Sequence, residues 1–380
     1  MLLVGCGSKE TTETASNNTS SSEENNKVAS DVQLPPQMTW SVYDVGSTGY
    51  AEASAIANEI TNQYGTNIRM IPSGTSVGRM IPLKNGSAQI GRIGDEFIFS
   101  FEGIHEFAEK SWGPQDVRLV WAPTTNFGLA VREDSDIKSI QDLKGKKIPW
   151  ITANHSINLK TEAMLKFGRV SLVDVELVDL TSYGAQADAL KAGQVDVVSM
   201  NPQASSLFEI DTSIGIRWMP MPEDDKNGWT SAQELVSWIQ PDLVDTGAGL
   251  TNSEPVWMIR YVYPVVAYAS QDKDTIKALV QGLIDTYGKY KDVLPPLAAF
   301  SKDEVLVQPV GIPFHEGTVE ILKELDLWTP EADEENNRLI ERGKQLKSLW
   351  DGALDQSKKD GISDSEFTEY WLNKRNESLK

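Results

Sequence analysis

Two short turns early in the chain carry groups that suit the binding of a small anion. In both turns Gly alternates with Ser or Thr, and each turn stands between a strand-like run and an amphipathic run. Free N–H groups at a helix N-terminus, together with the helix dipole, favour a carboxylate. The alternative is that Ser47 or Thr48 only caps a helix. Because the second turn repeats the chemistry of the first, we expect both to converge on one ligand. The residues concerned are Gly46, Ser47, Thr48, Gly49, Tyr50, Ser73, Gly74, Thr75 and Ser76.

Arg92 is a candidate anchor for the same ligand. It lies within the apolar run "AQIGRIG", which predicts a buried strand. A buried guanidinium without an anionic partner is costly, and a bidentate bond to a carboxylate is its natural geometry. The carboxylate can come from a bound ligand or from an Asp or Glu of the chain, and the sequence leaves both open.

A second group of polar residues lies further along the chain. Asn154, His155, Ser156 and Asn158 form a turn that can offer hydrogen bonds from the opposite side of a cleft, or simply a polar turn. Tyr183 and Asn201 are further candidate ligand contacts. A charged His155 in contact with the ligand would make binding sensitive to pH.

The sequence offers little for catalysis. The three histidines are scattered and show no HExxH spacing for a metal, and no Gly-x-Ser-x-Gly elbow is present. The glycine turns lack both the phosphate-loop ending and the GxGxxG pattern. We therefore expect a protein that is not an enzyme and has no cofactor, and the sequence singles out no metal-binding residues.

The elements that must position these residues alternate between strand and helix from Met38 onward, which is typical of an α/β architecture. Two extended segments, 127–133 and 256–270, are expected to cross between two lobes, so that one lobe is inserted in the other. The resulting hinge and cleft would bring the polar turns together, since ligands sit at the carboxyl ends of strands in such sheets. The expected division is 38–132 and 259–328 for the first lobe, 133–258 for the second, and 329–380 for a helical C-terminal extension.

Several local expectations can be checked directly. Residues 97–109 are expected to form one helix, and 256–270 one long strand. Residues 220–253 are expected to be irregular because they contain several Pro, Gly and Asp residues. The acidic tail is expected to be helical from Glu334 onward.

Composition restricts the partners. A formal net charge of −20 argues against nucleic acid and favours a soluble monomer. The only cysteine, Cys6, follows Leu3, Val4 and Gly5 in a short resemblance to a bacterial lipobox, which predicts a lipid anchor at Cys6. The Ser-, Thr- and Asn-rich residues that follow predict a disordered tether, so that residues 1–37 would hold the protein at a membrane surface.

The chain resembles the TAXI-type solute receptors of TRAP transporters. The resemblance is carried by "GSTGYAEASAIANEI", "SGTSVGRMIPLKNGSAQIGRIGDE", "AVREDSDIKSIQDLKGKKI", "ADALKAGQVDVVSMNP" and "PFHEGTVEILKELDLW", in family order. It implies a two-lobed, periplasmic-binding-protein-like (type II) fold, an exported protein, a small carboxylate or amino-acid ligand, and a TRAP permease as partner. The sequence departs from the family pattern at "TANHSIN", where a glycine-rich turn is usual, and at Arg92.

Two other functions are compatible with the same fold. A sensory lipoprotein would bind its ligand in the same cleft and report to a membrane signalling protein. An enzyme related to pyrimidine synthesis in thiamine formation uses a similar two-lobed fold, although export and tethering argue against it.

Overall fold

A computed structural model describes residues 33–251 and 253–379. The predicted lipidation site Cys6 and the predicted tether up to residue 32 lie outside this part of the chain. Within it, no helix is both long and apolar enough to cross a membrane. The residues described form one compact unit.

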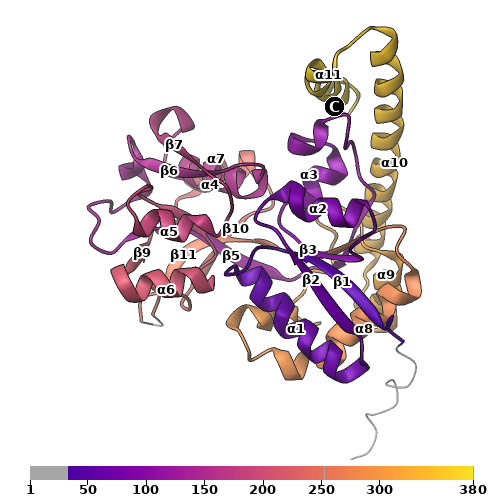
Figure 1. The fold of residues 1–380 in the computed structure, drawn as a ribbon, viewed down its shortest axis with the longest axis horizontal. Helices are drawn as coiled ribbons and strands as arrows, with labels where there is room; N and C mark the ends of the chain where they lie inside the picture. The colour runs from indigo at the N-terminus through magenta and orange to yellow at the C-terminus, as the bar shows by residue number, and fades with distance from the viewer. Residues whose placement is uncertain (1–32, 252, 380) are drawn as a thin grey trace, which may run out of the picture. The chain divides into compact units, whose positions relative to one another are not determined.

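A first five-stranded sheet has the order β2-β1-β3-β12-β4. Its strands β1, β2 and β3 run parallel, and β12 is antiparallel to both β3 and β4. Helices α1 and α8 lie on one face of this sheet and α2 on the other (Figure 1). The strands are β1 (Gln37–Val42), β2 (Asn67–Pro72), β3 (Ile90–Arg92), β4 (Val117–Trp121) and β12 (Val265–Tyr268). The helices are α1 (Thr48–Tyr64), α2 (Ser76–Lys84), α3 (Glu96–Glu102), α8 (Lys273–Tyr290) and α9 (Glu316–Glu324).

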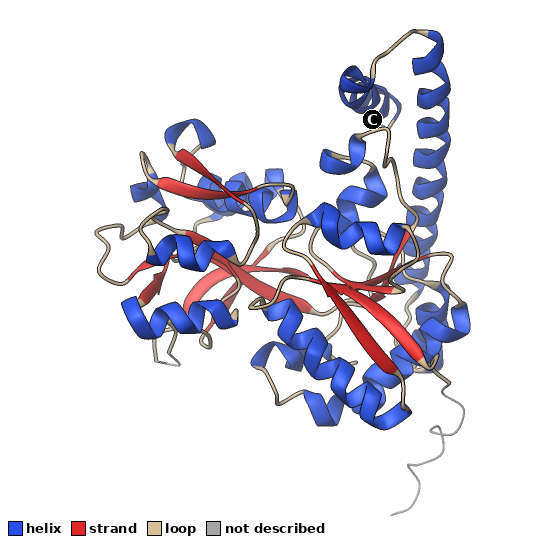
Figure 2. Ribbon diagram, in the orientation of Figure 1, coloured by secondary structure: helices blue, strands red, loops and turns tan. Residues whose placement is uncertain are grey.

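A second sheet has the order β10-β11-β5-β8, with β9 also paired to β5, and a separate two-stranded sheet joins β6 to β7. Figure 2 shows helices packed around both. The strands are β5 (Thr124–Arg132), β6 (Lys147–Ile151), β7 (Glu176–Leu180), β8 (Val198–Met200), β9 (Ile216–Trp218), β10 (Gln240–Val244) and β11 (Val256–Val262). The helices are α4 (His155–Phe167), α5 (Ala185–Lys191), α6 (Ser205–Ile214) and α7 (Lys226–Leu235).

The chain passes between the two sheets twice. Strand β5 begins three residues after β4 ends, and β11 is followed by β12 after a break at Pro264. Strands β5 and β11 are paired with each other, antiparallel. We call the elements of the first sheet and its helices the first lobe, and β5 to β11 with α4 to α7 the second lobe. The residue boundaries expected for the lobes stay predictions.

Two further helices, α10 (Pro330–Lys359) and α11 (Asp364–Ser378), make up a C-terminal extension. Figure 1 shows α10 as a long helix beside the first lobe. The carboxylate of Glu102 anchors both helices. It accepts hydrogen bonds of 2.5 and 2.8 Å from Arg342 on α10 and pairs with Arg375 on α11. The expected helical extension is therefore present.

Some local expectations were wrong, for identifiable reasons. The segment expected to be irregular contains α7 and β10. Helix α7 forms because Asp225 caps it and the apolar face of the helix packs on α4. Strand β10 pairs with β11. The expected long strand is split at Pro264, which has no N–H to donate. The expected helix 97–109 is divided in two. Helix α3 ends at Gly103 (φ 64°), and a separate 3-10 helix covers His105–Ala108. Helix α6 and strand β9 were not expected.

Candidate functional site

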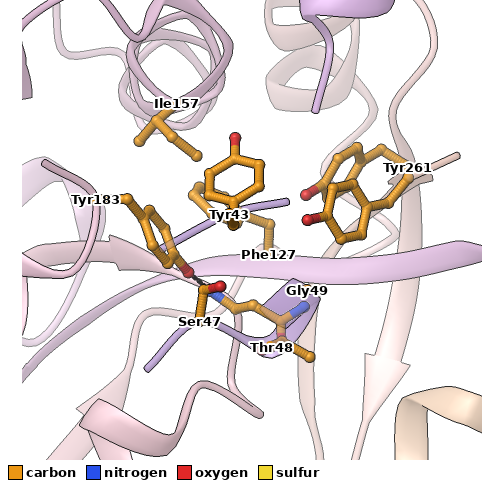
Figure 3. Close-up of a pocket in the computed structure, with 10 residues that line it drawn as sticks. Tyr43, Ser47, Thr48, Gly49, Phe127, Ile157, Tyr183 and Tyr261 are labelled. Atoms are coloured by element: carbon orange, nitrogen blue, oxygen red, sulfur yellow. Dashed lines mark hydrogen bonds between the residues drawn. The ribbon is translucent and has the colours of Figure 1, made fainter. Parts of the chain in front are cut away.

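A small cavity lies where the two lobes meet. Its volume is about 20 Å³, close to the space of a single water molecule. It is walled by the start of α1, the crossing strands β5 and β11, the start of α4 and the turns next to α5 and β8 (Figure 3). The residues that line it are Tyr43, Ser47, Thr48, Gly49, Phe127, Ile157, Tyr183, Asn201, Tyr261 and Tyr263.

The first turn offers the cavity a set of hydrogen-bond donors. Ser47 is the N-cap of α1, since its hydroxyl accepts a 3.2 Å hydrogen bond from the N–H of Tyr50 and donates one of 2.7 Å to the carbonyl of Asp44. The next two N–H groups, of Thr48 and Gly49, make no hydrogen bond within the described chain. The buried hydroxyl of Thr48 is also without a partner there. Capping and a free donor set therefore occur in the same turn.

Gly49 is required by a close approach. A Cβ atom at this position would overlap the hydroxyl of Tyr263, which lies directly over the start of α1. A glycine thus lets the crossing segment close on the helix, and it leaves the backbone N–H exposed to the cavity.

Aromatic rings form most of the wall. Tyr43 packs edge-to-face on Tyr183 and Tyr263, with ring centroids 5.5 and 5.8 Å apart, and Phe127 packs on Tyr261 at 6.2 Å. The hydroxyls of Tyr261 and Tyr263 have no hydrogen-bond partner among residues 33–251 and 253–379. Burial raises the pKa of both phenols, so both stay neutral and can donate. The wall of the cavity is therefore mainly aromatic, and it carries several O–H donors.

Three cations lie behind these rings. The guanidinium carbon of Arg79 is 3.4 Å from the centroid of Tyr43, and that of Arg92 is 3.7 Å from the centroid of Tyr263. The ammonium of Lys160 lies 4.4 Å from the centroid of Tyr261. Cations over aromatic faces are attracted by the ring quadrupole, more strongly when they are desolvated. The tyrosine rings thus separate the three cations from the cavity.

Each of these cations is paired with a buried carboxylate. Arg79 Nε donates to Glu96 at 2.6 Å, Arg92 bonds Glu52 at 2.5 and 3.1 Å, and Lys160 pairs with Asp95 across the lobes. Burial raises the pKa of Glu52 and of Asp95, even though the nearby cations act in the opposite direction. Arg79 Nη2 and Arg92 Nη1 are buried without a partner in the described chain.

The lobes hold each other through several direct hydrogen bonds. Ser76 N–H donates to the carbonyl of Ala153 at 2.9 Å, and the side-chain amide of Asn154 donates to the carbonyl of Gly74 at 2.8 Å. Asp95 N–H donates to the hydroxyl of Ser156 at 2.9 Å. Gly184 N–H donates to the carboxylate of Asp44, also at 2.9 Å. The structure is therefore a closed form, in which polar turns of one lobe bind those of the other.

Two histidines are stacked across the same contact. The rings of His105 (first lobe) and His155 (second lobe) have centroids 3.7 Å apart and are 23° from parallel. The backbone N–H of His155 donates to the carboxylate of Glu106 at 2.7 Å. Burial lowers the pKa of His105 to about 3 and that of His155 to about 4. Both rings are thus neutral in the closed form at neutral pH.

The sequence profile of the NMT1-like family matches residues 44–325, which includes both lobes and ends before the C-terminal extension. The chain belongs to the NMT1-like family. Among curated proteins, no sequence relative matches this NMT1-like chain.

The fold is shared with a solved structure. A structure titled as a periplasmic transporter superimposes on this NMT1-like protein with a TM-score of 0.50 and 14% identity, over 80% of this chain and 97% of the other. The periplasmic aliphatic sulphonate binding protein SsuA of Escherichia coli has a TM-score of 0.43 and 16% identity, over 80% and 92%. The R. palustris protein Rpa4515 with adipate has a TM-score of 0.49 and 14% identity, over 82% and 96%. The chain has a mixed α/β, periplasmic-binding-protein-like fold.

The structure brings together only part of the site that the sequence of this NMT1-like protein predicts. The predicted residues that line the cavity are Ser47, Thr48, Gly49, Tyr183 and Asn201. The predicted residues that do not line it are Gly46, Tyr50, Ser73, Gly74, Thr75, Ser76, Arg92, Asn154, His155, Ser156 and Asn158. Most of this second set caps helices or joins the lobes. Direct ligand contacts by these residues stay predictions.

Individual members of that set show why they lie outside the cavity. Thr75 caps α2, accepting from Gly78 N–H at 3.1 Å. The side chain of Asn158 bonds both the N–H and the carbonyl of Ile151, at 2.8 and 2.9 Å. Arg92 has the internal carboxylate partner that the sequence left open, and it contacts the cavity only through the ring of Tyr263.

Sequence reasoning missed five lining residues, namely Tyr43, Phe127, Ile157, Tyr261 and Tyr263. One signal was available. Tyr261 and Tyr263 are two residues apart in a largely apolar crossing segment, and this spacing places both on one face of an extended chain. In the described part of this NMT1-like chain, no group of three or more His, Cys, Asp or Glu residues is arranged to hold a metal ion.

Proposed function

We propose that this protein is an extracytoplasmic solute-binding receptor that captures a small carboxylate between its lobes and delivers it to a membrane transporter. The observation that carries the proposal is the donor-rich cavity enclosed by turns of both lobes. Its donors include the Thr48 hydroxyl, the N–H groups of Thr48 and Gly49, and the hydroxyls of Tyr261 and Tyr263. A carboxylate, which only accepts hydrogen bonds, suits such a set.

Binding requires the lobes to move apart. A cavity of about 20 Å³ holds no more than about one water molecule, so a solute enters an open form and the lobes close on it. The two segments that join the lobes, at β5 and β11, are the natural place for that hinge. The solute then shifts the population toward a closed form by its contacts with both lobes.

The walls suggest what the rest of the solute is like. The aromatic rings suit a small hydrocarbon or 2-oxo body once the lobes have opened to admit it, and they bring no side-chain charge into the cavity itself. The cations behind the rings are balanced by Glu52, Asp95 and Glu96, so the site favours a short mono- or dicarboxylate or an amino acid over a highly charged anion. No nucleophile with an adjacent general base lines the cavity, which favours binding over catalysis.

A transport role of TRAP type is the finer part of this proposal. It is supported by the resemblance of the sequence motifs to TAXI-type receptors, by membership of the NMT1-like family and by the fold shared with a structure titled as a periplasmic transporter. Export and anchoring through Cys6 belong to the same proposal.

The test combines ligand identification with one matched pair of variants. Residues 31–380 are purified without added solute, and native mass spectrometry before and after denaturation identifies any bound molecule. A thermal-shift panel of short dicarboxylates, 2-oxoacids and acidic amino acids follows. Thr48→Val removes the donor without changing the shape of the side chain. Thr66→Val is the control, because Thr66 is also buried with an unpartnered hydroxyl but does not line the cavity.

The expected result is a carboxylate that binds the wild type and Thr66→Val equally. Thr48→Val should weaken it by roughly ten- to a hundredfold, since a hydrogen bond to a charged group contributes about 1.5–3 kcal/mol. A neutral solute, or equal binding by both variants, would overturn the carboxylate assignment. A panel without any binder, together with a solute-free mass, would count against the receptor proposal itself.

A further inference from the structure

A second and much larger cavity lies between the C-terminal extension and the first lobe. Its volume is about 890 Å³, within the range of small-molecule sites in proteins. One wall is formed by α10, and the other by residues around β4, α3 and the end of β12. It shares no lining residue with the cavity between the lobes, so it is a separate place on the molecule.

Aromatic side chains line this cavity and are held in place. Trp350 on α10 packs edge-to-face on Phe367 and Trp371, with ring centroids 5.2 and 4.8 Å apart, and its indole lies so close to Gly113 that a Cβ there would overlap it. Trp112 packs edge-to-face on Phe107 at 4.9 Å. These contacts prevent the two indoles from rotating to fill the cavity.

The polar wall is fixed as well. Gln115 donates from its side-chain amide to the carbonyls of Trp112 and Gly113 at 2.9 and 2.8 Å, and its oxygen accepts from the hydroxyl of Tyr268 at 2.8 Å. The turn that carries Trp112 is therefore rigid. A flat ligand entering this space would meet a preformed surface, and preorganisation reduces the entropy lost on binding.

The charge of the cavity differs from that of the whole protein. Three basic residues, Arg118, Lys344 and Lys347, line it together with only two acidic ones, Asp116 and Asp351. The chain as a whole carries −20. All three are paired with acidic residues, namely Asp116, Glu341 and Asp351, so the cavity is close to neutral and repels an organic anion less than the rest of this acidic protein does.

Arg118 is the group best placed to hold an acid. Its side chain is only 12% exposed, and its Nη1 bonds the carbonyl of Val117 and the carboxylate of Asp116. Its Nε and Nη2 make no hydrogen bond within the described part of the chain. Arg118 also lines an adjoining cavity of about 390 Å³ along the same helix. A guanidinium with open N–H groups beside aromatic walls is suited to an aromatic acid.

We propose that this cavity is a second binding site, which takes a small planar organic anion with its acid group on Arg118 and its ring between Trp112 and Trp350. The site is independent of the proposed transport function, because it uses neither the hinge nor the cavity between the lobes. Half of its wall belongs to the extension, which lies outside the region matched by the family.

The test uses the full chain and naphthalene-2-carboxylate as the probe, with naphthalene-2-carboxamide as the neutral analogue of the same shape. Binding is measured by calorimetry and by quenching of tryptophan fluorescence. The variant Arg118→Gln removes the anchor. Arg132→Gln is the control, because Arg132 is partly exposed on the second lobe and paired with Asp134. Lys347→Gln, at an exposed position on the rim, provides a second test if Arg118→Gln fails to fold.

The expected result is saturable binding of the carboxylate by the wild type and by Arg132→Gln. We expect binding about tenfold weaker or worse for Arg118→Gln and for the carboxamide, and about two- to threefold weaker for Lys347→Gln. Equal binding of the acid and the amide, no effect of either cavity variant, or no saturable binding would overturn the proposal. Thr48→Val should bind the probe like the wild type. A loss there would place the probe between the lobes and would also overturn it.

Discussion

Acidification is expected to separate the two lobes, because the stacked pair of His105 and His155 must lose its neutral state. Burial lowers the pKa of these side chains from 6.5 to about 3 and about 4, respectively. In an open form each ring regains water and its ordinary pKa. The open form therefore binds protons that the closed form does not. The contribution of the pair to closure is complete above pH 6.5 and is lost as the pH falls toward the lowered values.

The size of the effect follows from the distance to the ordinary pKa. At about pH 5 each histidine lies about 1.5 pH units below 6.5, which costs the closed form about 2 kcal/mol per ring, or roughly 30-fold in the ratio of closed to open molecules. The two rings are in contact and titrate together, so twice this value is an upper bound. Two neighbours also matter. Arg375 lowers the pKa of His105 further, whereas burial raises the pKa of Glu106, which opposes opening on acidification.

The assay is a distance measurement between spin labels on the two lobes. Cys6 is the only cysteine of the chain, so Cys6→Ser leaves a background in which new cysteines are unique. Asn58→Cys on α1 and Asp188→Cys on α5 place one label at an exposed position of each lobe. Pulsed electron paramagnetic resonance at about pH 7.5 and at about pH 5 should show the distribution shift toward longer distances at the lower pH.

The control removes the titrating groups and keeps the neighbours. His155→Phe retains an aromatic ring, and His105→Asn suits the positive φ of 53° at this position. The double variant retains Glu106 and every other acid, so any response due to those groups remains. A pH response of the same size in the double variant, or none in the wild type, would refute the role of the histidine stack.

Three further predictions concern binding and stability. Gly49→Ala should abolish solute binding but not folding, because the new methyl group meets the hydroxyl of Tyr263 within the cavity; calorimetry and circular dichroism separate the two effects. Glu102→Gln should lower the free energy of unfolding by about 3 kcal/mol in a urea titration, since it leaves two guanidinium groups of the extension without their carboxylate, whereas Glu341→Gln at an exposed pair should cost less than about 0.5 kcal/mol. Lys160→Met should cost about 3–5 kcal/mol because its buried partner stays uncompensated, and an unchanged urea midpoint would contradict this.

The fold was largely predictable where local signals agree with the final packing. Helix α1 begins after the cap at Ser47 and ends at Gly65 (φ 72°), and the expected strand Lys147–Ile151 has the same bounds in the structure. Helix α7 was missed because Gly228 and the neighbouring Pro and Asp residues weaken its local signal. Its stability comes from packing, as Trp229 lies edge-to-face on Phe167 at 5.4 Å. Such a tertiary contact has no local signature.

The candidate site was only partly predictable for a related reason. The donors at the start of α1 follow from cap chemistry, and a turn of that kind can be predicted from a sequence. The hydrogen bond between Ser76 and Ala153 joins segments far apart in the chain, so nothing local reveals that the second turn closes on the other lobe. Tyr261 and Tyr263 resemble ordinary core residues until the crossing of the strands places them at the cavity.

The attachment of the C-terminal extension has a mechanical consequence. The hydrogen bonds and ion pairs that join α10 and α11 to the remainder of the described chain end on Glu102, Gly103, Lys110, Phe314, Lys323 and Trp328, none of which belongs to the second lobe. We therefore expect the extension to move together with the first lobe, without restraining the motion of the hinge. Deleting these helices should change the melting temperature of the first lobe, while the ratio of open to closed molecules stays the same. A partner that binds the extension would immobilise the first lobe and leave the second lobe free to move.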